Sequence, residues 1–272
     1  MAAVLGILPA HVDIVGPVTL GDSSFDIDPP LLVLAALVLA LGGVVKGSIG
    51  VGLPVVVIAV LSHFLPAPIA LALVTFPILL TNLWQAIHAG RLMEPLKRFW
   101  PMIGCLILFI WISARLVVSL DPRVLYAMIG ATVTSFAITN YLKIVWTVRP
   151  SSEKWAAPLA GSIGGFLGGI STIWGPPMMM YFIMLRLPKE AYIQAVGLIW
   201  FIASIPLVIA YIHHGILTAQ TAPLSLLACI PGFAGLAVGQ MLRKRINQEM
   251  FRKVLLLFLF VIGLNLIRRS IF

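Results

Sequence analysis

Two matching clusters of small and polar residues are the part of this 272-residue chain best suited to chemistry. One, at 42–54, reads Gly-Gly-Val-Val-Lys-Gly-Ser-Ile-Gly-Val-Gly-Leu-Pro, and the other, at 164–177, reads Gly-Gly-Phe-Leu-Gly-Gly-Ile-Ser-Thr-Ile-Trp-Gly-Pro-Pro. Such glycines can interrupt membrane helices and expose backbone N–H groups. Two helix N-termini aimed at one point, with the hydroxyls of Ser48, Ser171 and Thr172, would bind an oxyanion. Close helix packing through small residues is the alternative reading of the same glycines.

Lys46 lies inside the first cluster, 15 residues after the start of an apolar run at Leu31. That is roughly 22 Å along a helix, which is too deep for easy snorkelling. A cation there costs at least about 2.5 to 3.5 kcal/mol and is a candidate for function. All nine Asp and Glu residues lie in the N-terminal arm or in linkers, so the expected counter-ion is a bound anion. The alternative is a helix that breaks at Gly42-Gly43 and leaves Lys46 at the cytoplasmic edge.

Further polar residues fall within apolar runs. Asn82, Gln85 and His88 follow one another at helical spacing, and Gln194 lies early in a later run. They either line a path or form hydrogen bonds between helices. Three tryptophans could wall a cavity or anchor at the membrane interfaces: Trp84, Trp174 and Trp200. The candidate substrate-binding residues are Lys46, Gly47, Ser48, Gly50, Gly52, Pro54, Asn82, Gln85, Gly169, Ser171, Thr172, Trp174, Gly175, Pro177 and Gln194.

Enzyme chemistry and bound metals fit these residues poorly. Cys105 and Cys229 have no neighbouring His or Cys, so they predict neither a metal site nor a disulfide framework. A nucleophilic serine would need a base, and only Lys46 could supply one to Ser48 or Ser171. We therefore expect no catalytic residue, no metal and no cofactor.

The elements that position these residues must be membrane helices. Hydrophobic residues make up 61% of the chain and charged residues 10%, whereas soluble domains carry about 25% charged residues. Apolar runs near the length of a membrane span predict an all-α polytopic protein. Its ten expected segments are about 31–46, 53–64, 69–90, 99–120, 122–146, 155–171, 177–185, 191–211, 221–242 and 254–267. The second and seventh are short, and the last is 14 residues long.

The basic excess, 18 Lys and Arg against nine Asp and Glu, is a topology signal. If all ten segments cross and the N-terminus is outside, the inner linkers collect 13 cations, as the positive-inside rule requires. They are Arg91, Lys97, Arg98, Lys143, Arg149, Lys154, Arg186, Lys189, Arg243, Lys244, Arg245, Arg252 and Lys253. If the short second and seventh segments did not cross the membrane, the linkers from Arg91 to Arg98 and from Lys143 to Lys154 would lie on the outside of the membrane. Clusters spaced this way exclude a nucleic-acid partner, and the acidic N-terminal arm is unlike a signal peptide.

An internal repeat organises the chain. Gly42-Gly43 recurs 122 positions later as Gly164-Gly165, Cys105 matches Cys229 at 124, and Asn140 matches Asn265 at 125. The predicted divisions are an extracytoplasmic arm at 1–30, a first transmembrane repeat at 31–147, a cytoplasmic linker at 148–154 and a second repeat at 155–272. Five segments per half would make the repeats inverted, with the site where interrupted helices of the two halves meet.

The two clusters and the two-half layout resemble the TauE/SafE sulfite-exporter family of bacterial permeases from about residue 31 onward. In place of the family's commonest Gly-Gly-Gly core, this chain has Gly-Val-Gly-Leu at 50–53 and Thr-Ile-Trp-Gly at 172–175. The resemblance implies a multi-pass protein of the bacterial inner membrane, and the distribution of the cations predicts that its N-terminus is in the periplasm. It implies a secondary transporter for sulfite or an organosulfonate such as sulfoacetate, and export is the direction expected.

Other functions stay open at this point. The chain could be an uptake permease or a channel-like uniporter for another small anion, or an assembly subunit that transports nothing. The partners expected are the lipid bilayer, a small sulfur-containing anion and a second copy of the chain in a homo-oligomer.

Overall fold

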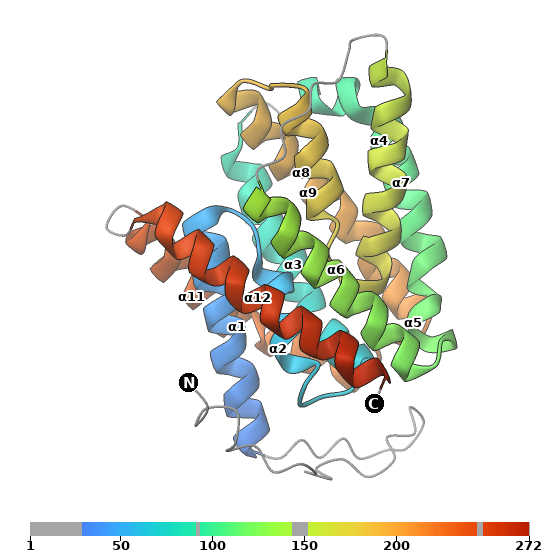
Figure 1. Ribbon diagram of the computed structural model, residues 1–272, viewed down its shortest axis with the longest axis vertical. Coiled ribbons are helices and arrows are strands. Elements are labelled where there is room, and N and C mark those ends of the chain that lie inside the picture. Colours follow the sequence, from blue (N-terminus) through green and yellow to red (C-terminus); the bar gives the residue numbers. More distant parts are fainter. Residues whose placement is uncertain (1–28, 91–92, 143–151, 244–246, 272) are drawn as a thin grey trace.

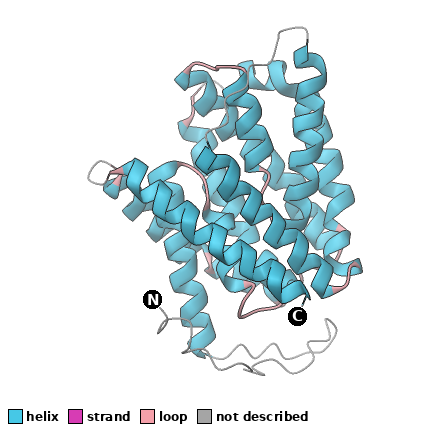
Figure 2. Ribbon diagram, viewed as in Figure 1, coloured by secondary structure: helices cyan, strands magenta, loops and turns pink. Residues whose placement is uncertain are grey.

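The computed structural model describes residues 29–90, 93–142, 152–243 and 247–271, and this part of the chain is helical, with no strand (Figures 1 and 2). The helices are α1 (Pro29–Ile49), α2 (Leu53–Leu61), α3 (Ala67–His88), α4 (Met93–Ala114), α5 (Leu116–Ser119), α6 (Pro122–Leu142), α7 (Glu153–Ser171), α8 (Gly175–Met184), α9 (Lys189–His213), α10 (Thr221–Leu227), α11 (Cys229–Leu242) and α12 (Gln248–Ile271). The all-α prediction is confirmed for the described residues. The expected arm at 1–30 falls almost entirely outside them, as does most of the linker at 148–154.

The two Gly/Pro clusters form the turns of two helical hairpins. α1 packs on α2 and α7 packs on α8, and proline within the first helical turn begins both short helices. The turn before α2 passes through Gly50 and Gly52, whose φ angles are +93° and +110°. The turn before α8 uses Thr172 at φ +61° instead. In Figure 1, α1 and α2 lie in the lower part of the molecule, whereas α7 and α8 lie in the upper part.

Each hairpin packs on a long helix from the other half of the chain. α1 contacts α11, and a methyl group on Gly43 or Gly47 would lie 2.2 Å from a carbonyl oxygen of α11. α7 contacts α4 in the same way, because a methyl group on Gly161 would lie 2.2 Å from the Met102 carbonyl oxygen. The contacts advance along both helices together, so both pairs are parallel. Such close approach requires glycine.

The remaining long helices pair with their counterparts in the other half. α6 lies beside α12 (Figure 1). The two helices are antiparallel, because Gly130 is against Gly263 and the Arg252 guanidinium donates to the Asn140 carbonyl oxygen. α3 runs antiparallel to α9, with Ala89 against Gly197 and Asn82 bonded to Ser204. The set of four helix pairs is therefore unchanged when each helix is replaced by its counterpart in the other half of the chain.

Seven described helices are long and apolar enough to cross a membrane. They do not include α2 and α8, which have 9 and 10 residues and reach only about 14 to 15 Å. The final helix is longer than the 14 apolar residues predicted, because Gln248–Ile271 is helical throughout. The count of ten segments and the inversion of the repeats are not confirmed by these findings and stay predictions.

Candidate functional site

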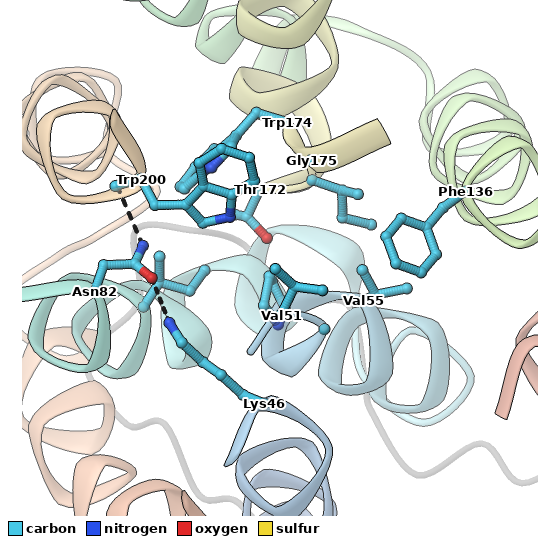
Figure 3. Close-up of a pocket in the computed structure, with 13 residues that line it drawn as sticks. Lys46, Val51, Val55, Asn82, Phe136, Thr172, Trp174, Gly175 and Trp200 are labelled. Atoms are coloured by element: carbon cyan, nitrogen blue, oxygen red, sulfur yellow. Dashed lines mark hydrogen bonds between the residues drawn. The ribbon is translucent and has the colours of Figure 1, made fainter. Parts of the chain in front are cut away.

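The turns of the two hairpins meet at one cavity, in the interior of the protein (Figure 3). Its volume is about 20 Å³, close to the smallest space that holds a water molecule. Residues of both hairpins, of α3, of α6 and of α9 line it: Lys46, Val51, Gly52, Pro54, Val55, Ile78, Asn82, Phe136, Thr172, Ile173, Trp174, Gly175 and Trp200. Residues more than 120 positions apart in the sequence thus share one small space.

Lys46 supplies the positive charge of this cavity. Its side chain is only 4% exposed, and α1 continues without a break from Pro29 to Ile49. The helix break at Gly42-Gly43, on which the alternative interpretation depended, is therefore wrong, and Lys46 is buried within the protein. The ammonium group donates to Thr81 Oγ1 at 2.9 Å and to Asn82 Oδ1. Within the described residues neither acceptor is charged, and an ammonium group has three N–H donors.

Asn82 is held in place by α9. Its Nδ2 group donates to the Trp200 carbonyl oxygen at 3.2 Å and to Ser204 Oγ at 2.8 Å. With both N–H bonds directed at α9, the amide oxygen faces Lys46 (Figure 3). The Thr81 hydroxyl donates to the Pro77 carbonyl oxygen, so its lone pairs are free to accept from Lys46. This network joins α1, α3 and α9 and fixes the position of the ammonium group.

Two helix N-termini border the same cavity. α2 begins at Leu53 and α8 at Gly175, and the first N–H groups of a helix have no intrahelical acceptor. Prolines at the second position of α2 and at the second and third positions of α8 carry no N–H group, so fewer donors remain there than in an ordinary first turn. Both ends carry partial positive charge. Trp174 adds a third kind of donor, because its indole Nε1 is buried and has no hydrogen-bond partner in the described part of the chain. The cavity wall therefore combines one cation, two helix N-termini and an unused N–H group.

The structure brings together seven of the predicted site residues: Lys46, Gly52, Pro54, Asn82, Thr172, Trp174 and Gly175. Eight others do not line the cavity: Gly47, Ser48, Gly50, Gln85, Gly169, Ser171, Pro177 and Gln194. Of the tryptophans considered as cavity walls, Trp174 and Trp200 lie there, whereas Trp84 is 44% exposed.

Two glycines and two serines outside the cavity stabilise helix packing or a turn. Gly47 contacts the α11 backbone, and Gly169 contacts the α4 backbone. Ser48 Oγ donates to the Val44 and Gly239 carbonyl oxygens, which links α1 to α11. Ser171 Oγ donates to Leu167 and accepts from the Ile173 N–H group, which stabilises the second turn.

Gln85, Gln194, Pro177 and Gly50 are also absent from the cavity lining. Gln85 and Gln194 are half-buried near the end of α3, where Gln194 Nε2 approaches Gly90. Pro177 is in the first turn of α8. Gly50 has open space beside its Cα atom.

Sequence reasoning did not single out Thr81, Ser204 or Phe136. Thr81 precedes Asn82 in an apolar run, so a pair of adjacent polar residues was the available signal. Phe136 and Ser204 gave none, because an aromatic or a small hydroxyl residue is ordinary in a membrane helix. Their place follows from how α6 and α9 cross the two hairpins.

Comparison with known proteins gives one match. The family model described as Sulfite exporter TauE/SafE matches residues 34–266, which is most of the chain and includes both hairpins. No curated protein and no solved structure matches.

Proposed function

Because the chain belongs to the TauE/SafE sulfite exporter family of membrane transporters, we propose that it is a secondary transporter whose central cavity binds a small sulfur-containing oxyanion at Lys46. The substrates proposed are sulfite and organosulfonates such as sulfoacetate, and the direction proposed is export across the bacterial inner membrane. The observation that carries this proposal is the buried Lys46 ammonium, which has only neutral acceptors among the described residues. A buried cation with no partner carboxylate is costly unless an anion joins it.

The architecture proposed is a pair of inverted repeats. Two features of the helix packing support it. The pair α1 and α11 has the pair α7 and α4 as its counterpart in the other half, and α3 and α6 pack antiparallel on their counterparts α9 and α12. When a helix packs antiparallel on its own counterpart from the other half, a two-fold axis perpendicular to both helices relates the two. Transporters with inverted repeats have this symmetry. Each hairpin then enters the membrane and returns to the face it came from. Because each hairpin enters and returns, it does not change the side on which the following segment lies. The basic linkers therefore all stay in the cytoplasm, as the positive-inside rule favours.

Transport requires the hairpins to separate. A sulfonate group does not fit in about 20 Å³, so in this proposal the closed cavity corresponds to a state between loading and release. The substrate would replace water around the Lys46 ammonium, the α2 and α8 N-termini and the Trp174 indole N–H. An inside-negative potential drives an anion outward by about 2.3 kcal/mol per charge per 100 mV, which is sufficient for export without a coupled ion.

Sulfite and sulfoacetate flux into proteoliposomes tests the proposal. Replacement of Lys46 by Ala should reduce flux at least about tenfold, because an interaction with a buried charge is worth more than 1.4 kcal/mol. Lys46→Arg should retain part of the flux, since it keeps the charge but changes the geometry. Lys97→Ala, at an exposed position, is the matched control. Normal flux by folded Lys46→Ala protein would refute the site, and no flux of either anion by the wild type would refute the function.

A further inference from the structure

A second and much larger cavity lies at the start of α12. Its volume is about 600 Å³, and it is lined by Ile49, Asn140, Tyr141, Glu249, Arg252, Lys253 and Leu256. Arg252 and Lys253 bring two positive charges to it. Glu249 lies 3.7 Å from Lys253 Nζ and offsets part of that charge.

The guanidinium group of Arg252 is fixed by the fold. Its Nη2 atom donates to the Asn140 carbonyl oxygen at 2.5 Å, near the C-terminal end of α6, where a helix carries partial negative charge. A guanidinium group has five N–H donors in a rigid fork, so one bond to Asn140 leaves donors for a second partner. A fixed Arg with spare donors suits a planar or tetrahedral oxyanion.

The same two segments of the chain line this cavity and the central one. On α6, Phe136 lines the central cavity and Asn140 the larger one, and four residues of helix span about 6 Å. On the first turn, Val51 lines the central cavity and Ile49 the larger one. Between these two lies Gly50, with φ +93° and open space beside it. Where these two segments line the cavities, Phe136, Ile49 and Val51 are apolar.

We infer that the cavity at Arg252 and Lys253 is an anion-binding vestibule, from which an oxyanion reaches Lys46 when the Gly50 turn and Phe136 move aside. This inference rests on the proposed function, which identifies the anion as a sulfur-containing oxyanion. The positions equivalent to Arg252 and Lys253 in the other half, 125 residues earlier, are Ala127 and Met128. The charge is therefore confined to the end of α12 next to a basic linker, which is the cytoplasmic face in the topology proposed above. Capture on that face concentrates an anion where export begins.

A thiol-labelling experiment tests the vestibule without requiring transport. Tyr141→Cys is placed in a protein whose Cys105 and Cys229 are replaced by Ser, and the rates of labelling by an anionic and a cationic methanethiosulfonate are compared. Arg252→Gln with Lys253→Gln should lower the anionic-to-cationic ratio about three- to tenfold at low ionic strength. Sulfoacetate should slow labelling in the parent and not in this double variant. An unchanged ratio, or equal protection in both proteins, would overturn the inference.

Flux from each side of the membrane supplies the second readout. In inverted membrane vesicles the double variant should raise the KM for sulfite and leave the maximal rate within about twofold, with the effect shrinking at 1 M salt, where the Debye length is about 3 Å. Arg252→Lys should restore part of the KM, and Arg268→Gln, exposed at the other end of α12, should not change it. A KM raised equally from both faces would contradict a vestibule on one face. If Lys46→Ala abolishes flux while sulfoacetate still protects Tyr141→Cys from labelling, the vestibule binds anions independently of the central cavity. The two sites can thus be tested separately.

Discussion

Lys46 shows how a membrane protein can keep a charge available in its interior. Its acceptors are a hydroxyl and an amide oxygen, which orient an ammonium group without neutralising it. A carboxylate in the same place would form a buried ion pair and remove the net charge. Asn82, with its amide nitrogen bound to α9, therefore suits an anion site better than an acidic residue would.

Asn82→Asp tests this interpretation. The new carboxylate would pair with Lys46 and compete with the substrate, so flux of sulfite should fall at least about tenfold. The ion pair should offset only part of the thermal stability lost with the two Nδ2 hydrogen bonds to α9. Flux assays in proteoliposomes and thermal unfolding in detergent measure the two effects. The matched control is Gln240→Glu, an amide-to-acid change at an exposed position of α11, which should leave both unchanged. Full flux in folded Asn82→Asp protein would contradict the role of Lys46.

His63 fastens the turn after α2 to the C-terminal helix. Its Nδ1 lies 2.9 Å from the Ala59 carbonyl oxygen, which can only accept, so Nδ1 carries the hydrogen. Nε2 then accepts from Asn265 Nδ2 at 2.9 Å, and this arrangement needs neutral imidazole. Burial, helped by the nearby Arg269 charge and opposed by the bond to Ala59, lowers the pKa of His63 below its ordinary value of 6.5.

A lowered histidine pKa means that the unfolded chain binds the proton more readily, so stability falls as the pH drops from about 6.5 toward the lower folded value. Thermal unfolding in detergent at pH 7.5 and pH 5.5 should show a larger loss for the wild type than for His63→Gln. The residual loss in the variant reports all other groups. Equal losses in the two proteins would show that His63 does not titrate on unfolding.

At the scale of elements, glycine faces set how closely the helices pack. A methyl group on Gly235 would lie 1.9 Å from the Ala40 carbonyl oxygen, and one on Gly239 would lie 2.2 Å from that of Val44. Backbone atoms cannot move aside independently, so a larger residue must push α1 away from α11. Because α1 ends beside the cavity, this contact also places Lys46.

Gly235→Ala should therefore destabilise the protein by about 1 to 3 kcal/mol, the usual cost of overpacking. Gly104→Ala on α4 is the control, since nothing lies within 4 Å of the added methyl group, and alanine is the better helix former. Thermal unfolding in detergent of both variants, side by side, measures the difference. A Gly235→Ala protein as stable as Gly104→Ala would mean that α1 and α11 are not in this close contact.

At the scale of the whole molecule, the turns of the two hairpins meet at the centre, and the other long helices of the described residues pack around them. The closed cavity lies where the hairpin turns meet, so relative movement of the hairpins would open it toward one face at a time. Neither hairpin needs to cross the bilayer for this. The sidedness of the connecting segments then depends only on the long helices between them.

Thiol accessibility in cells tests that sidedness. In a background without Cys105 and Cys229, a membrane-impermeant reagent added outside should label Asp121→Cys, in the segment before α6, and should not label Lys97→Cys near the start of α4. Both positions are exposed on the protein, so a difference reports the membrane and not burial. Permeabilised cells should label both. The reverse pattern would invert the proposed topology and with it the direction of export.

Composition and local pattern already determined that the chain is an all-helical membrane protein and where most of its helices lie. Runs of apolar residues have no other stable arrangement in a bilayer, and proline and glycine mark breaks by backbone geometry alone. The deep position of Lys46 was visible as well, because depth along a helix is a matter of counting. The division of the glycines between turns and packing was not visible, since both uses require the same small residue.

Tertiary structure decided which residues share the site. Gly47 and Ser48 lie beside Lys46 in the sequence yet contact α11, while Asn82 and Trp174 come from distant segments and line the cavity. A helix presents neighbouring residues about 100° apart, so only the packing of α1 between α2 and α11 determines which of them faces inward. The vestibule at Arg252 depends in the same way on α12 crossing α6, a contact between segments more than 100 residues apart.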